Sequence, residues 1–284
     1  MKQSSTLKKI KCSILSSFLG MYYKGGTTIR ALSCNQEKPK IVVSLTSFTP
    51  RLEKLYITLG SIFNQSQQPD KIVLYLGDDV DADKIPLSIL NLQKKGLEIR
   101  FVENIMSHKK YYYVFKDYPD SCVITIDDDI IYHKHMIKKL YKTHLTFPGC
   151  ICAMRCHEIT YDTTGRPEPY SKWIKNSTAY NEIKPNLFFT SGAGTLFPVN
   201  CFDETLYDLN TIKELCYTAD DVWLNAMARY SNVSIVNTSL NENERVILSV
   251  SGTQEVALKY ENLYGPGNDR CVENLIEKYG VGIL

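Results

Sequence analysis

Three aspartates in a row, Asp127, Asp128 and Asp129, directly follow the apolar run 122–126, which is typical of a fully buried strand. Adjacent carboxylates cannot stay together inside a core, because like charges removed from water repel one another or become protonated. We therefore expect the triplet at the C-terminal edge of a sheet, where open α/β proteins bind ligands, with a cation beside it. Carboxylate oxygens suit Mg²⁺ or Mn²⁺, which usually hold substrate phosphates as well. The alternative is an acidic turn that caps a helix starting near His133.

Strand-like and helix-like segments alternate around the triplet. The patterns predict strands at 41–45, 71–76, 97–102 and 122–126, and helices at 51–63, 84–95, 109–116 and 133–145. This alternation predicts an α/β fold with a doubly wound, mostly parallel sheet and helices on both faces. The second half is less regular, with strand-like runs at 151–155, 187–190 and 233–236, a long polar stretch at 161–185, and helices at 220–230 and 271–279.

Composition narrows the functional class. A chain of 284 residues with 44% hydrophobic and 23% charged residues is ordinary for a soluble globular protein. The net charge of +2, without a basic stripe that carries interleaved aromatic residues, argues against a nucleic-acid partner. The nine cysteines lack the paired spacing of a zinc site, which favours reduced thiols and a cytoplasmic location.

The N-terminal segment 1–39 differs from the rest in charge. Up to Gln36 it has six basic residues and no acidic one. The apolar residues that recur at helical spacing are Leu7, Ile10, Ile14, Phe18 and Met21. We expect a basic amphipathic arm that can lie on an anionic membrane at its cytoplasmic face, or else pack against its own domain or remain a loose tail.

Two further motifs fit the chemistry of the triplet. Thr46-Ser47, with Arg51 beyond it, follows the first strand, where hydroxyl and amide groups could hold a nucleotide or cap the next helix. Gly192-Ala193-Gly194 has little side chain to keep a sugar or another backbone segment away, although such a run also forms tight turns.

An acidic pair, Asp220 and Asp221, opens the predicted helix 220–230. Thr218 lies three residues before Asp221, so the two could form a capping box, and acids in a first turn favour the helix dipole. The same position suits a general base: a carboxylate on a rigid helix start, partly desolvated by Trp223, could accept a proton from a substrate hydroxyl.

The order of these motifs resembles the GT-A glycosyltransferases over roughly residues 40–270, especially family-2-like bacterial enzymes of capsule and lipopolysaccharide assembly. The triplet matches their D-x-D motif at Asp127 and Asp129. Ala219-Asp220-Asp221 is similar to their Glu-Asp motif, which implies that Asp221 is the catalytic base, with Asp220 beside it. The run 190–195 is similar to their glycine-containing strand end. Less specific similarities are Lys109-Lys110, Asn262 and Asn268-Asp269.

The resemblance implies a hexosyltransferase that takes a nucleotide-diphosphate sugar, with Mn²⁺ or Mg²⁺ on Asp127 and Asp129, and inverts the anomeric carbon. The acceptor would be a glycan or a lipid-linked glycan. Residues 40–284 would form one catalytic domain, with a nucleotide-binding half at 40–130 and an acceptor and catalytic half at 131–284. The residues expected to bind the donor are Thr46, Ser47, Arg51, Lys109, Lys110, Asp127, Asp128, Gly192, Ala193 and Gly194.

The chain departs from the family pattern at two places. Gly77-Asp78-Asp79-Val80 lacks the Gly-Ser step of the family's Asp-Asp-Gly-Ser, and the last histidine is His157, whereas many relatives use a later one as a metal ligand. A rival class is the sugar nucleotidyltransferases, which would need a glycine-rich loop where this chain has Ser44-Leu45-Thr46-Ser47-Phe48. The other rival is a module that binds a divalent ion or a glycan without turnover.

Overall fold

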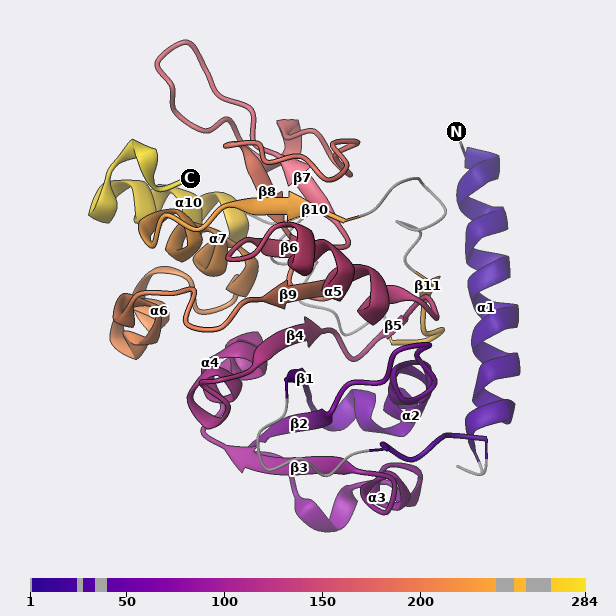
Figure 1. The fold of residues 1–284 in the computed structure, drawn as a ribbon. Coiled ribbons are helices and arrows are strands. Elements are labelled where there is room, and N and C mark those ends of the chain that lie inside the picture. The colour runs from indigo at the N-terminus through magenta and orange to yellow at the C-terminus, as the bar shows by residue number, and fades with distance from the viewer. Residues whose placement is uncertain (1, 25–27, 34–39, 239–247, 254–266) are drawn as a thin grey trace.

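A central β-sheet organises the computed structural model, which describes residues 2–24, 28–33, 40–238, 248–253 and 267–284, with side chains from Ser13 onward. The strands of this sheet are β1 (Ile41–Ser47), β2 (Lys71–Gly77), β3 (Leu97–Val102), β4 (Cys122–Ile126), β6 (Ile151–Ala153), β9 (Ala193–Phe197) and β10 (Ile235–Asn237). Their order across the sheet is β10-β6-β9-β4-β1-β2-β3 (Figure 1).

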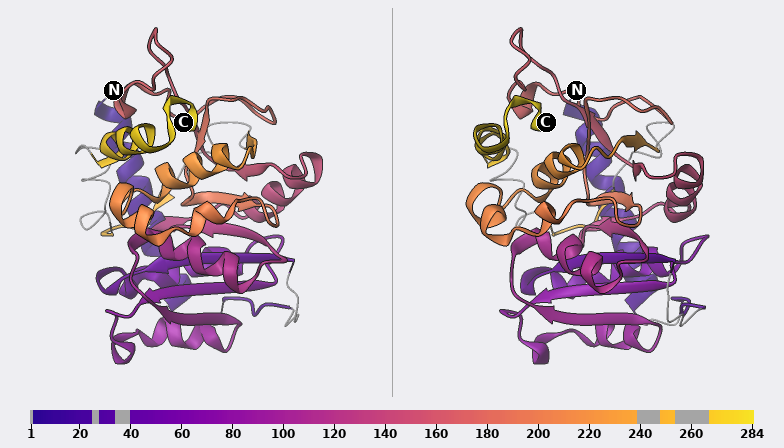
Figure 2. Two further views of the ribbon diagram at one scale, coloured as in Figure 1. Left: turned by 90° about the vertical axis from the view of Figure 1, so that its left-hand side faces the viewer. Right: turned by 60° about the vertical axis from the view of Figure 1, so that its left-hand side comes forward.

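The prediction of an α/β fold on a mostly parallel sheet is confirmed. The β1 strand pairs in parallel with β2 and β4, β2 does so with β3, and β10 with β6. The β9 strand runs antiparallel to both β4 and β6, and its residues 193–197 were not predicted as a strand. Figure 2 shows the early strands below and the later ones above, joined into one sheet by the β4–β9 pairing.

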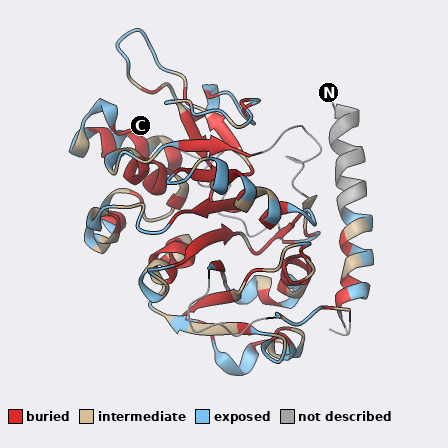
Figure 3. Cartoon of the chain, viewed as in Figure 1, coloured by how far each residue is buried: buried red, intermediate tan, exposed pale blue. Residues whose placement is uncertain are grey.

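Helices cover both faces of the sheet, as expected. One face is covered by α2 (Thr49–Phe63), α3 (Leu87–Gln93) and α5 (Met136–Thr146), and the other by α4 (Lys109–Asp117), α6 (Leu209–Leu215), α7 (Asp220–Tyr230) and α10 (Gly267–Tyr279). Successive side chains of β1 point to opposite faces of the sheet, so both faces are packed. Val42 belongs to the hydrophobic cluster of Val114, and Val43 belongs to that of Leu52. The inner strands are almost wholly buried (Figure 3), so the edge where they end is the place for charged side chains.

Two helix boundaries correct the predictions. The helix expected at 84–95 is shorter, because Pro86 lies at its N-cap and a 3₁₀ turn, η1 (Ala82–Lys84), precedes it. The helix expected at 133–145 begins at Met136, and a short strand, β5 (Ile130–Ile131), separates it from the triplet. The interpretation of the triplet as a cap of this helix is therefore wrong.

The second half contains smaller elements beside the sheet. The β7 strand (Cys156–Glu158) pairs antiparallel with β8 (Leu187–Phe189) outside the central sheet, and β5 pairs with β11 (Leu248–Ser249). The long polar stretch at 161–185 buries Trp173 beside Phe188, so part of it belongs to the core. Four further 3₁₀ turns complete the described elements: η2 (Met106–His108), η3 (Tyr170–Lys172), η4 (Glu204–Tyr207) and η6 (Val281–Ile283).

The N-terminal segment forms one long helix, α1 (Lys2–Lys24), which lies along the side of the domain next to α2 and β11 (Figure 1). Tyr23 is buried against Gly60 of α2, and Ser16 Oγ accepts a hydrogen bond of 3.0 Å from the backbone N–H of Ser251. In the part of the chain that the structure describes, no helix has the length and apolar content required to span a bilayer.

The described cysteines are all free thiols: Cys122, Cys150, Cys152, Cys156, Cys201, Cys216 and Cys271. Most of them are buried, and burial raises the pKa of the Cys152 thiol to about 12. Such thiols pack as small apolar groups and are unreactive at neutral pH.

Candidate active site

The acidic triplet lies where the sequence places it, directly after the buried strand β4, and its three carboxylates have different surroundings. The side chain of Asp127 is 39% exposed, whereas Asp128 and Asp129 are buried. Asp128 Oδ2 accepts a hydrogen bond of 2.6 Å from Ser47 Oγ, and its other oxygen pairs with Arg51. The same guanidinium lies 3.4 Å from Asp129 Oδ2. Arg51 therefore supplies part of the positive charge that the triplet requires.

Lys110 connects the triplet to the second acidic motif. Its Nζ lies 2.8 Å from Asp127 Oδ1 and 3.0 Å from Asp220 Oδ2. The ammonium group is almost fully buried; burial alone would lower its pKa, but the surrounding carboxylates raise it well above the usual lysine value. Ser44 Oγ donates a hydrogen bond of 2.5 Å to the Lys110 carbonyl and so ties the start of α4 to β1. Two motifs far apart in the sequence thus share one buried cation.

The acidic pair opens α7 as predicted, but it does not cap the helix in the predicted way. The N-cap residue is Ala219, which makes no side-chain cap hydrogen bond, so the capping box with Thr218 as the N-cap is wrong. The Asp221 carboxylate instead accepts hydrogen bonds from the backbone N–H of Ser191, at 2.8 Å, and from its Oγ, at 2.6 Å. Ser191 Oγ also lies 2.9 Å from Asp220 Oδ2.

The two acids of this pair have opposite pKa shifts. Burial would raise the pKa of Asp220, but the nearby charges of Lys110 and His108 lower it to about 2. Burial and the adjacent charge of Asp220 raise the pKa of Asp221 to about 6. Asp221 also keeps part of its surface accessible, whereas Asp220 is buried. Asp221 is thus the acid of the pair that can both reach a substrate and exchange a proton near neutral pH.

Gly192 determines where the carboxylate of Asp127 can lie. A Cβ built on Gly192 would overlap that carboxylate, so a larger residue would push it away. The Gly192 carbonyl also accepts hydrogen bonds from the Asp127 N–H, at 3.2 Å, and from the hydroxyl of Tyr132 at 2.5 Å. Ala193 and Gly194 belong to β9, and Gly194 has a φ of 98° that favours glycine.

The remaining predicted donor residues are already bonded within the chain. Thr46 Oγ1 donates 2.8 Å to the Tyr75 carbonyl of the neighbouring strand. Lys109 Nζ donates to Asn104 Oδ1 at 2.5 Å and to the Met106 carbonyl at 2.8 Å, and burial lowers the Lys109 pKa to about 8. The structure thus brings Ser47, Arg51 and Lys110 to the acidic cluster, while Lys109 lies beside Asn104.

Several residues of this cluster had no predicted role, although Ser191 lies in the run 190–195 that resembles the family's strand end. Ser191 holds both acids of the pair, and His108 is buried with Nε2 2.9 Å from the Cys216 carbonyl. Arg155, at the end of β6, is half-buried and its Nε donates 2.8 Å to Thr190 Oγ1. A signal for Ser191 was its position next to Gly192; nothing local marked Arg155.

The charge balance and the donor atoms of the cluster fit a divalent cation. Its carboxylates, Asp127, Asp128, Asp129, Asp220 and Asp221, outnumber Arg51, Lys110 and Arg155. Asp127 is the most open of the triplet, and its position depends on the missing side chain of Gly192. Carboxylate oxygens are the hard ligands that Mg²⁺ and Mn²⁺ prefer. Among the residues described, no group of three or more acidic, histidine or cysteine side chains is arranged to hold a metal ion by itself.

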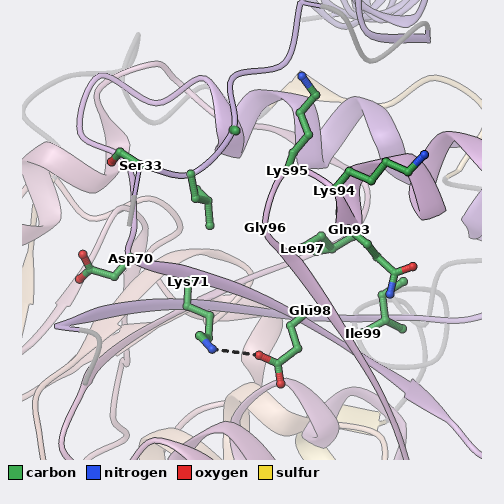
Figure 4. Close-up of a pocket in the computed structure, with 12 residues that line it drawn as sticks. Ser33, Asp70, Lys71, Gln93, Lys94, Lys95, Gly96, Leu97, Glu98 and Ile99 are labelled. Atoms are coloured by element: carbon green, nitrogen blue, oxygen red, sulfur yellow. Dashed lines mark hydrogen bonds and ion pairs between the residues drawn. The ribbon is translucent and has the colours of Figure 1, made fainter. Parts of the chain in front are cut away.

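A separate hollow of about 710 Å³ lies at the opposite edge of the sheet, where β2 and β3 begin (Figure 4). Its charged side chains are partly paired, since Lys71 Nζ lies 3.2 Å from Glu98 Oε2. Because the triplet follows the C-terminal end of β4, which is parallel to β1 and β2, this hollow is not part of the candidate site.

The structure describes Asn268 and Asp269, two of the residues with a less specific similarity to the family. Asn268 is buried, and Asp269 Oδ1 accepts a hydrogen bond of 2.7 Å from the backbone N–H of Tyr170. Asp269 therefore fixes the Tyr170 backbone, while Asn262 lies outside the described residues.

No family model and no curated protein matches this sequence. Solved structures with a similar fold include the mannosyltransferase PcManGT from Pyrobaculum calidifontis in complex with GDP-Man and Mn²⁺, with 12% identity, a TM-score of 0.44, and coverage of 82% of this chain and 66% of that one. Residues 1–349 of S. aureus TarS in complex with UDP match with 15% identity and a TM-score of 0.45, over 70% of this chain and 58% of that one. A CMP:2-keto-3-deoxy-manno-octonic acid synthetase with CTP matches with 9% identity and a TM-score of 0.41, over 72% and 90%.

Proposed function

We propose that this chain is a glycosyltransferase, which moves a sugar from a nucleotide-diphosphate donor to a hydroxyl group of a glycan or glycolipid. Since the TM-scores of the similar structures lie below 0.5, the proposal rests on the residues of the site. The observation that carries it is the bridge made by Lys110, which places the open carboxylate of Asp127 and the acidic pair of α7 in one cluster. A carboxylate that can hold a divalent ion for the donor diphosphate and a general base for the acceptor hydroxyl are the two groups that the proposed transfer uses.

Asp221 is the general base in this proposal. The acceptor O–H would give its proton to the Asp221 carboxylate as its oxygen forms a bond to the anomeric carbon. The bond from that carbon to the diphosphate oxygen breaks, and its electron pair leaves with the nucleoside diphosphate. Ser191 holds the carboxylate through two hydrogen bonds and so fixes its direction. Attack opposite the leaving group would invert the configuration.

The donor end of the site would lie at the triplet. Asp127 and Asp129 would hold Mn²⁺ or Mg²⁺, which when bound offsets the negative charge of the departing diphosphate. Arg51 neutralises Asp128, and Ser47 holds the same carboxylate through a hydrogen bond. Gly192 has no side chain, which lets the Asp127 carboxylate lie directly against it.

Arg155 is a further cation that could contact the substrate. Its Nε donates 2.8 Å to Thr190 Oγ1, next to Ser191, which holds the acidic pair of α7. Within the described residues, no carboxylate lies within ion-pair distance of its guanidinium, whereas Arg51 and Lys110 are both paired. A guanidinium of this kind suits a phosphate oxygen of the donor.

Product analysis separates this proposal from its rivals. The purified protein is incubated with a panel of nucleotide-diphosphate sugars, Mn²⁺ and soluble glycan acceptors, and released nucleoside diphosphate is measured. A glycosyltransferase releases it together with a sugar-extended acceptor, whose anomeric configuration NMR would report. A sugar nucleotidyltransferase would instead release pyrophosphate from a nucleoside triphosphate and a sugar phosphate, and a binding module would release neither. The last two results contradict the proposal.

The donor sugar and the pathway are proposed from the resemblance of the motifs. A hexose donor and an acceptor of the capsule or lipopolysaccharide type are the first to test, with lipid-linked and free oligosaccharides compared in the same assay.

A further inference from the structure

The α1 helix carries an apolar face that turns away from the domain. Ile14, Phe18 and Met21 are 66%, 58% and 73% exposed, and Tyr22, whose ring lies 6.3 Å from that of Phe18, is exposed as well. Helical spacing places these four side chains on one side of the helix. We call them the outer apolar face.

The inner side of the same helix makes the contacts with the domain. Ser16 is buried next to β11 and Tyr23 is buried against α2. Leu19 is partly buried and packs against the hydrophobic clusters that contain Tyr23 and Val250. The amphipathic pattern predicted from the sequence is therefore present in a different form. The residues that were expected to form its apolar side, from Ile14 to Met21, face outward, and smaller residues and Tyr23 make the internal packing.

The charge around this face points to the partner. The segment up to Gln36 has six basic residues and no acid, and Lys24 and Arg30 are exposed at its C-terminal end. An anionic bilayer offers apolar groups and negatively charged headgroups along the whole length of a helix, which matches an outward apolar face on a segment with basic residues and no acid. Outward aromatic and aliphatic side chains on a basic helix suit the bilayer.

The helix is also connected to the candidate site. Ser16 bonds to Ser251, next to Val250, whose backbone N–H donates 2.8 Å to the Asp129 carbonyl. Lys54 Nζ of α2 donates 2.7 Å to the Ser251 carbonyl. A surface to which α1 binds would therefore lie at a fixed position relative to the acidic triplet.

We propose that the outer apolar face of α1 docks the protein on an anionic phospholipid surface, lying in the plane of the interface. This inference goes beyond the proposed transfer reaction and does not depend on it. Docking would bring lipid-linked acceptors to the enzyme as neighbours in the same layer.

Vesicle flotation tests the docking with the full chain. Vesicles of phosphatidylcholine with and without phosphatidylserine are mixed with the protein and with two variants. One variant carries Ile14→Gln, Phe18→Gln and Met21→Gln, which remove apolar groups without changing charge. The matched control carries Ser13→Gln and Ser17→Gln, two exposed positions on α1 outside the apolar face. Thermal unfolding is compared for all three.

The protein and the serine control should float with phosphatidylserine vesicles, while the triple variant should lose about tenfold or more of its partitioning and unfold at the same temperature. Binding should weaken as salt rises, because the attraction to the lipid headgroups is screened. Absence of flotation of the unmodified protein would overturn the proposal, as would equal flotation of the triple variant. If the unmodified protein instead forms a dimer in solution that the triple variant loses, the face binds a second copy and the proposal is wrong.

Discussion

Lys110 is the cation that joins the two acidic motifs of the candidate site. It is buried between Asp127 and Asp220, and a buried cation without its carboxylates, or carboxylates without their cation, would be strongly destabilising. Lys110 keeps Asp220 ionised, and burial together with the negative charge of Asp220 raises the pKa of Asp221. One lysine thus gives the two acids of α7 different properties, a structural one for Asp220 and a reactive one for Asp221.

The first prediction, at the scale of single residues, concerns the variant Asp221→Asn. The amide oxygen can still accept both hydrogen bonds from Ser191, so the fold should be retained. Loss of a general base typically lowers the rate by about 10²–10⁴-fold, so kcat should fall by at least about a hundredfold while donor affinity stays the same. Steady-state kinetics and donor titration measure the two quantities.

Asp220→Asn is the comparison for that variant. It removes a partner of buried Lys110, so it should lower the melting temperature, whereas Asp221→Asn should leave it unchanged or higher at pH 7.5. Near-normal turnover by Asp221→Asn would exclude Asp221 as the base.

The second prediction follows from the pKa of Asp221, which is raised to about 6. A base must be ionised, so kcat/KM should fall as the pH drops below about 6, and this limb should be absent from the residual activity of Asp221→Asn. The folded protein holds this proton more tightly than the unfolded chain, so protonation of Asp221 favours the folded state. That contribution is lost as the pH rises through 6. Unfolding by denaturant between pH 4 and 7, compared with the variant, would measure it.

At the scale of elements, the loop between β8 and β9 is the part that joins the two ends of the site. Ser191 holds the start of α7, and the adjacent Gly192 leaves room for the Asp127 carboxylate at the end of β4. Thr125 Oγ1 donates 2.9 Å to the Ser191 carbonyl and fastens this loop to β4. A shift in the loop would therefore move the base and the donor carboxylate together.

The third prediction tests this loop with Gly192→Ala. The backbone of Gly192 does not require a positive φ, so the added methyl group should act through its overlap with Asp127. A misplacement of about 1 Å in an active-site group can lower the rate by about a hundredfold. We expect that loss with a small change in melting temperature.

Gly282→Ala is the matched control, because a Cβ there has no neighbouring atom within 4 Å. Full activity of Gly192→Ala would show that the reaction does not depend on the position of the Asp127 carboxylate against Gly192.

At the scale of the whole molecule, the acidic cluster keeps an excess of negative charge that its own cations do not balance. The fold can hold this arrangement because Asp127 remains open to solvent and Asp221 can be protonated. Binding of a divalent ion together with a nucleotide diphosphate would relieve the imbalance and stabilise the folded state by mass action.

The fourth prediction is a thermal shift that depends on both ligands. A donor and Mn²⁺ together at 100 times the dissociation constant should stabilise the protein by about 2.7 kcal/mol, and a chelator should remove the effect and the activity. Asp129→Asn should abolish the metal-dependent part of the shift. Glu277→Gln, which removes an exposed carboxylate on α10, is the control and should behave as the unmodified protein. Unchanged turnover by Asp129→Asn in chelator would contradict the metal assignment.

The sequence by itself determined the features that local physical chemistry controls. A buried apolar run followed by three acids must end at a sheet edge, and β4 does so. The predicted helix 220–230 has the same bounds as α7, since its apolar spacing and acidic first turn are local signals. The alternation of strand and helix similarly predicted the parallel sheet.

The tertiary structure alone decided which distant residues meet. Strand order places β9 antiparallel between β4 and β6, so Ala193 and Gly194 became part of the sheet, while Gly192 lies in the turn before it. The pairing of Lys110 with both acidic motifs, the role of Ser191 and the outward direction of Phe18 also depend on which elements pack together. Periodicity reports which side of an element is apolar, but it does not report what lies across from that side, because such contacts join residues far apart in the chain.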